Sequence, residues 1–156
     1  VQAQRDGELI DLPPTTRRNL ELVQTLRGED SPTLFSLLDT CMTGMGSRML
    51  KSWLLTPRRD RAQAQQRQDA ITTLRSATLQ SSTLALWQGL RQQLKGSADV
   101  ERITARTALR QVRPRELAGL RATLLELPTL RDRVPAGSRY HQRWQHRYMR
   151  YRFRYA

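Results

Sequence analysis

The sequence predicts an all-α protein of about six helices, preceded by a short irregular or β-like segment. Between residues 31 and 134, apolar residues recur at the three- and four-residue spacing of amphipathic helices. Ser, Asp, Gly and Pro residues fall where helix caps and stops are needed. With 156 residues, the chain is long enough for one domain with its own hydrophobic core.

The first thirty residues carry the weakest pattern. A short apolar run ends at two consecutive prolines, after which Leu20, Val23 and Leu26 fall at three-residue steps and favour a helix. The alternation of Leu20 with Leu22 also permits a strand. We therefore predict only a lead-in segment over residues 1–30 and leave both alternatives open.

Two helices are predicted between residues 31 and 57. Ser31 is a suitable N-cap, Pro32 a suitable first helical residue, and Pro57 a stop for the second helix after the break at Thr43-Gly44. The apolar face of the first helix contains Leu34, Leu37, Leu38 and Cys41. The inner face of the second contains Met45, Met49, Leu50, Trp53 and Leu54.

Four more helices are predicted after residue 59. The residues expected to begin or end them are Asp60, Ser81 or Ser82, Gly96, Ala98, Arg110, Pro114 and Pro128. The residues expected to face inward are Ala70, Ile71, Leu74, Leu84, Trp87, Leu90, Leu94, Val100, Ile103, Thr107, Leu117, Leu120, Leu124 and Leu127.

The chain is strongly basic, with 27 Lys and Arg against 14 acids and a net charge of +13. All 14 acids and 21 of the basic residues precede residue 139, so that part carries +7 and the last eighteen residues +6. Such a charge indicates DNA, RNA, an anionic membrane or an acidic partner domain. No apolar run approaches the ~18 residues of a membrane span.

No pattern in the sequence assembles an active site. A phosphate-binding G-x-x-x-x-G-K-[ST] motif is absent, and His141 and His146 are five apart, which does not place them on one helical face for a metal. Cys41, the only cysteine, fits a reducing cytosol and is expected as a buried thiol rather than a nucleophile. We expect this chain to hold no cofactor and to catalyse no reaction.

Two charged stretches have structural and functional interpretations. Asp99 and Glu101 suit a helix start and, against a neighbouring helix, can form an interhelical ion pair. The cluster of Arg58, Arg59 and Arg61 is either solvated surface or a set of contacts to phosphate.

Several separated blocks resemble one family. They are TTRRNLEL (15–22), LLDTCMTGMGSRMLKSWLLTPRRD (37–60), RQDAI (67–71), DVERITAR (99–106) and RPREL (113–117). In order and spacing they are similar to the core, or lever, domain of the MutS mismatch-recognition proteins. The most specific block resembles the pattern T-x-x-G-x-R-x-L-x-x-W-x-x-x-P and contains Thr43, Gly46, Arg48, Leu50, Trp53 and Pro57.

The resemblance implies a helical lever over residues 31–134 within a bacterial, cytoplasmic, DNA-associated homodimeric clamp. It implies packing and interhelical contacts for Arg48, Trp53, Asp99, Glu101 and Arg102. The mismatch-reading, connector, clamp and ATPase domains of that family would lie outside this chain, together with ATP and magnesium. Mismatched double-stranded DNA would be the partner of the intact protein, and no membrane is expected.

The resemblance covers roughly residues 9–134 and stops near Val134, so the last segment, residues 135–156, lies outside it. From residue 139 it holds six arginines, six aromatic residues and no acid. It is either a nucleic-acid module, a half-buried strand over 151–155, or the product of a shifted reading frame. We predict a non-native or disordered tail, and keep a free-standing basic nucleic-acid-binding module as the alternative function.

Overall fold

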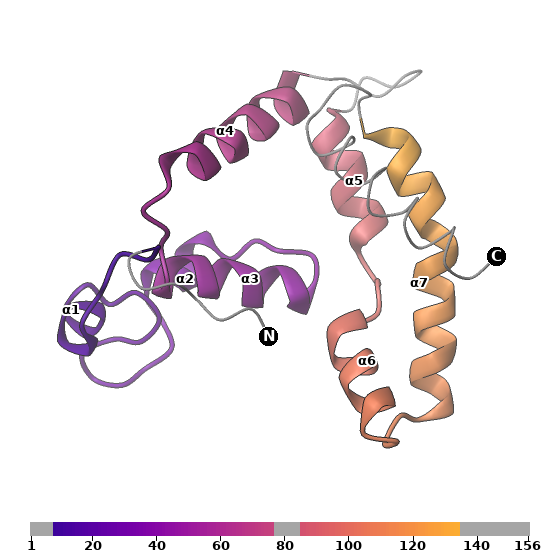
Figure 1. Cartoon of the computed structure of the whole chain (residues 1–156), viewed down its shortest axis with the longest axis horizontal. Helices are drawn as coiled ribbons and strands as arrows, with labels where there is room; N and C mark the ends of the chain where they lie inside the picture. Colours follow the sequence, from indigo (N-terminus) through magenta and orange to yellow (C-terminus); the bar gives the residue numbers. More distant parts are fainter. Residues whose placement is uncertain (1–7, 77–84, 135–156) are drawn as a thin grey trace.

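The computed structural model describes residues 8–76 and 85–134, and in these ranges the chain is helical (Figure 1). The seven helices there are α1 (Pro14–Asn19), α2 (Leu34–Leu38), α3 (Gly44–Leu55), α4 (Arg61–Ser76), α5 (Leu86–Leu94), α6 (Val100–Ala108) and α7 (Pro114–Arg133). Leu9 and Arg58 form an isolated antiparallel bridge. The all-α prediction is confirmed.

The helices form two groups joined by α4 (Figure 1). The α1–α3 group comprises residues 8–60, in which α2 packs against α3. The α5–α7 group comprises residues 85–134, in which the long helix α7 runs beside both α5 and α6. Helix α4 leaves the first group and packs against α5 of the second, so the chain has the outline of an arch.

Apolar packing holds the α5–α7 group together. Leu86 and Gly89 on α5 and Ile103 on α6 are buried. The turn between α5 and α6 approaches α7 closely, because the Ala98 amide donates to the Thr123 hydroxyl at 2.8 Å. The prediction that Ile103 faces inward is confirmed, and Gly96, at φ +90°, ends the turn after α5 as expected.

Residues 20–30 are irregular, as the fold-class prediction allowed, and form neither the helix nor the strand that their apolar spacing permitted. Helix α1 ends at Asn19, and Glu21 takes a left-handed backbone with φ 45° that continues neither a helix nor a strand. The loop instead closes on itself: the Glu21 carboxylate accepts from the Leu26 amide at 2.8 Å, and Thr25 is buried. Local polar contacts thus outweigh the apolar periodicity.

Two predicted helix boundaries are wrong. Thr33, not Ser31, is the N-cap of α2, because it forms a reciprocal pair of hydrogen bonds with Ser36 that Ser31 has no partner to make. Pro128 lies inside α7 and does not end it. Proline has no backbone N–H and so removes one helical hydrogen bond. Leu127 and Leu130, on either side of it, are nevertheless half-buried, so the packed face of α7 continues past Pro128.

Many of the predicted inner faces are exposed. Leu34, Leu37 and Leu38 are 39%, 76% and 47% exposed, and Cys41 lies beyond the end of α2 and is exposed as well. The large apolar side chains that are also exposed include Met49, Trp53, Ile71, Trp87, Leu94, Leu117 and Leu124. The buried hydrophobic residues of the described ranges are Leu22, Leu86 and Ile103. The reason is geometric, since the arch gives each helix few neighbours to pack against.

Some predictions fall outside the described residues. These concern the start of the fourth predicted helix at Ser81 or Ser82, the inward position of Leu84, both histidines and the segment 135–156. Within the described part, no helix is long and apolar enough to cross a membrane.

Candidate functional site on helix α3

Helix α3 carries most of the motif residues, and its N-terminus explains two of them. Thr43 is the N-cap, and its hydroxyl accepts from the Gly46 amide at 3.1 Å. A Cβ on residue 46 would lie 3.2 Å from the Cβ of Cys41 and 3.2 Å from the hydroxyl of Thr43. Glycine therefore lets the chain before α3 fold back against its first turn without displacing Cys41 or Thr43.

The same turn sets the chemistry of Cys41. Its residue surface is exposed, yet partial burial of the sulfur, followed by the neighbouring Asp39 carboxylate, raises the thiol pKa. Burial opposes ionisation of Asp39, but the hydrogen bonds from Ser47 and Cys41 together outweigh it and lower the Asp39 pKa. A thiol with a raised pKa is a poor nucleophile at neutral pH. The predicted burial of Cys41 is wrong, although its environment does not activate it.

Arg48 joins the two helical groups. Its guanidinium donates to both carboxylate oxygens of Asp99 at 2.8 Å and to Glu101 at 2.8 Å. Fifty-one residues separate Arg48 from Asp99 in the chain, and among the described residues the ion pairs between the two groups are those that Arg48 makes. The sequence allowed an interhelical ion pair for Asp99 and Glu101 without indicating its partner, which is Arg48.

Asp99 has two tasks at this junction. It is the N-cap of α6, where its carboxylate accepts from the Arg102 amide at 3.2 Å. The hydrogen bond from Arg48 lowers the Asp99 pKa to about 2, against the opposing effect of burial. The same bonds raise the pKa of Arg48. Arg102 lies at the edge of this charged cluster, with its Nε 3.6 Å from the Asp99 carboxylate and a side chain that is 69% exposed.

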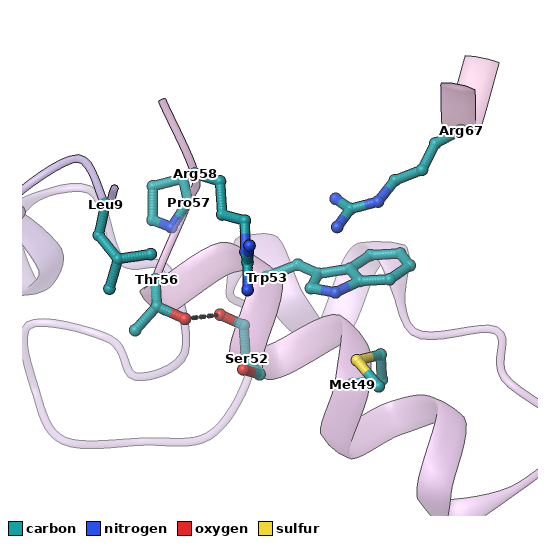
Figure 2. A pocket seen from close by; sticks show the side chains of 8 residues that line it. All are labelled: Leu9, Met49, Ser52, Trp53, Thr56, Pro57, Arg58 and Arg67. Carbon is teal, nitrogen blue, oxygen red and sulfur yellow. Dashed lines mark hydrogen bonds between the residues drawn. The ribbon is translucent and has the colours of Figure 1, made fainter. Parts of the chain in front are cut away.

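The other end of α3 bears a pocket of about 180 Å³ at the corner with α4 (Figure 2). Trp53, 43% exposed, forms one wall, and the guanidinium of Arg67 from α4 lies 3.8 Å above its ring centre. Pro57 follows the end of α3 and its carbonyl accepts from the Ile10 amide at 2.8 Å, which closes the opposite side. The lining residues are Leu9, Met49, Ser52, Trp53, Thr56, Pro57, Arg58 and Arg67.

The three arginines expected to contact phosphate do not act together in this structure. Arg58 lines the pocket, whereas the Nε of Arg59 donates to the Leu9 carbonyl at 2.9 Å and holds the lead-in segment. Arg61 is exposed in the first turn of α4. Sequence reasoning did not single out Arg67. It lies in the RQDAI block, but its contact with Trp53 depends on the angle between two helices, for which the sequence offers no local signal.

The described residues on and around α3 provide contacts at both ends of the helix. Among residues 8–76 and 85–134, no three His, Cys, Asp or Glu side chains gather as metal ligands would. What α3 provides is a capped helix with a charged contact to the other helical group and an arginine-lined pocket at its far end.

Comparison with known protein families decides the relationship. The family model described as MutS domain III matches residues 15–146, which is most of the chain. The chain belongs to the MutS domain III family. The matched range contains all the motif residues on α3 and α6, so their contacts are contacts within a MutS core domain.

The limits of the MutS match add two facts. It begins at residue 15, directly after the two consecutive prolines Pro13 and Pro14. It extends to residue 146, past Val134 and into the Arg- and aromatic-rich segment. As a domain III chain, the protein is part of a MutS-like mismatch repair protein.

Proposed function

We propose that this MutS domain III chain is a lever, which in the intact mismatch repair protein couples the nucleotide state of an ATPase to the grip on DNA. Two observations support this role. The first is membership of the MutS domain III family. The second, which carries the mechanism, is the division into two helical groups that α4 and the Arg48 ion pairs connect.

The mechanical argument rests on how little joins the two groups. Helices transmit displacement with little internal deformation, while the α1–α3 and α5–α7 groups share a small charged contact rather than a common apolar core. Part-exposed ion pairs are weak, so this contact biases one arrangement without preventing another. Coupling between distant sites needs an element with two arrangements that both sites influence. The Arg48 junction is suited to be that element.

Under this proposal the chain is not itself an enzyme. ATP and magnesium would bind to the ATPase domain, and the mismatch would be read by a separate domain of the same protein. Mismatched double-stranded DNA, the connector and clamp domains and a second subunit would be its partners in a bacterial cytoplasm. The basic charge of the body, +7 before residue 139, would then assist long-range attraction to DNA rather than base recognition.

The coupling is tested in the intact repair protein with Arg48→Met, with Arg102→Met as the matched control. Both changes remove one positive charge near Asp99, but only Arg48 comes from the α1–α3 group and reaches across to the α5–α7 group. We expect Arg48→Met to retain basal ATP hydrolysis and lose most of its stimulation by mismatched DNA, while Arg102→Met behaves as wild type. Equal stimulation in both variants would contradict the lever role of this junction.

The alternative function, a free-standing basic nucleic-acid-binding module, is separated by a second experiment. Binding of the isolated chain to homoduplex and mismatched DNA is measured across a salt series. As a lever, the chain binds both DNAs equally and weakly, and deletion of residues 139–156 removes most of that affinity because their six arginines are lost. Preference for the mismatched duplex would overturn the lever proposal.

A further inference from the structure

The pocket between α3 and α4 brings two arginines together without an acid. The eight described residues that line it include Arg58 and Arg67, and neither forms an ion pair with an acid in the described part of the chain. Figure 2 shows the Arg67 guanidinium above the indole ring of Trp53, while the Arg58 side chain extends into the pocket from beside Pro57. Two like charges held at one site repel each other, and an anion placed between them removes that cost.

The contact with Trp53 prepares Arg67 for an anion. Its guanidinium carbon lies 3.8 Å above the ring centre, so the ring holds the planar group by a cation–π interaction. The N–H donors of a stacked guanidinium point outward in its own plane, where a carboxylate can accept two of them. Of the two arginines, Arg67 is therefore the one whose guanidinium is already positioned to bind an anion.

The rest of the lining indicates what kind of anion fits. Leu9, Met49, Trp53 and Pro57 give the pocket an apolar wall next to its two charges. A pocket of about 180 Å³ has room for one or two side chains but not for a DNA duplex. Exposed Trp, Met and Arg are also the residues enriched at the centre of protein interfaces. We propose that this pocket binds an acidic protein segment, with a carboxylate between Arg58 and Arg67 and an apolar neighbour against Trp53 and Met49.

The proposal does not depend on the lever role, since it concerns a binding site of this chain alone. It is tested with the full chain and a short capped peptide of alternating glutamate and leucine. The indole N–H resonance of Trp53, assigned with Trp53→Phe, reports binding at the pocket and separates it from binding by the arginines of residues 139–156. We expect the peptide to shift this resonance saturably, and the peptide with glutamine in place of glutamate to leave it unchanged.

Three charge-matched variants locate the site. Arg58→Gln and Arg67→Gln each remove one proposed partner of the carboxylate. Each is expected to raise the Kd of the peptide, read from the Trp53 shift, about tenfold, the effect of losing one charged hydrogen bond. Arg121→Gln removes the same charge from an exposed position on α7 and is expected to bind as wild type. Far-UV circular dichroism verifies that all three variants keep their helices.

Arg67→Lys provides a finer variant, because it keeps the charge but loses the planar fork and is expected to bind between wild type and Arg67→Gln. Equal weakening by Arg121→Gln would overturn the proposal, as would an equal shift by the neutral peptide. Inorganic phosphate and a short single-stranded oligonucleotide test whether the pocket binds a phosphate group instead of a carboxylate. A Trp53 shift at lower concentrations of either than of the acidic peptide would assign the pocket to phosphate and overturn the protein partner.

Discussion

The two helical groups of this domain are held together by different means. In the α5–α7 group, two nine-residue helices and the long helix α7 pack through buried apolar positions such as Leu86 and Ile103. In the α1–α3 group the helices are short before α3, and hydrogen bonds hold the loops: the Leu34 amide donates to the Glu21 carbonyl at 3.1 Å and the Phe35 amide to the Leu22 carbonyl at 2.8 Å. Buried polar residues, Thr25 and Thr33, are part of this arrangement.

The difference teaches which changes each group tolerates. Apolar packing depends on volume and accepts similar side chains, whereas a loop held by hydrogen bonds depends on particular donors and acceptors. Conservative apolar substitutions should therefore be mild in the α5–α7 group, and loss of single polar atoms or of Gly46 should be costly in the α1–α3 group. Four substitutions or conditions test this contrast.

The largest effect is expected for Leu86→Ala in the α5–α7 group. Leu86 is 3% exposed, and removing a buried leucine side chain costs about 2–5 kcal/mol of unfolding free energy. Leu86→Met preserves the volume and is expected to cost less than about 1.5 kcal/mol. Urea titrations followed by far-UV circular dichroism measure both. Similar losses in the two variants would show that volume is not what stabilises this group.

Gly46→Ala is expected to destabilise the α1–α3 group by about 1–3 kcal/mol, because the new methyl group lies within 3.2 Å of Cys41 and Thr43. Gly119→Ala in α7 is the control. There the added carbon would lie 3.5 Å from the Cβ of Ala98, an ordinary contact, and alanine is the better helix former by about 1 kcal/mol. Opposite signs for the two variants in thermal melts support the contrast, and equal destabilisation contradicts it.

Thr33→Ala removes the hydroxyl that accepts from the Ser36 amide at 3.1 Å, and is expected to cost about 1 kcal/mol. Thr33→Ser keeps the hydroxyl and should retain most of the stability. Amide hydrogen exchange gives the location, because faster exchange in the Ala variant should be confined to α2 and the loop before it. Uniformly faster exchange, including α7, would mean that the two groups unfold as one unit.

The smallest effect is expected from acid at the Arg48 junction. The folded pKa of Asp99 is about 2, below its ordinary 3.8, so the stabilisation is complete above the ordinary value and is lost as pH falls toward about 2. Arg48→Met removes the main cause of the shift. Its melting temperature should therefore fall less steeply than that of wild type between pH about 4 and about 2. Parallel curves for the two proteins would show that this pair does not stabilise the fold.

The sequence predicted the helical elements well where caps and periodicity agree. Asp99, Gly96 and Pro114 mark real helix boundaries because their effects are local: a side chain bonding to the next turn, a left-handed backbone, a fixed φ. It was wrong at Ser31 and Pro128, and it left the conformation of residues 20–30 open. There several local options have similar free energies, and contacts such as Thr33 with Ser36, or Leu127 and Leu130 with their neighbours, select among them.

Family-like blocks in the sequence also determined the relationship to MutS domain III and placed Thr43, Gly46 and Arg48 among the residues to examine. Only the tertiary structure decided that Arg48 pairs with Asp99 and Glu101, that Arg67 stacks on Trp53, and that the predicted apolar face of α2 is exposed. The physical reason is one of distance along the chain. Caps and periodicity act within one or two helical turns, whereas ion pairs, stacking and burial depend on where other helices lie in space.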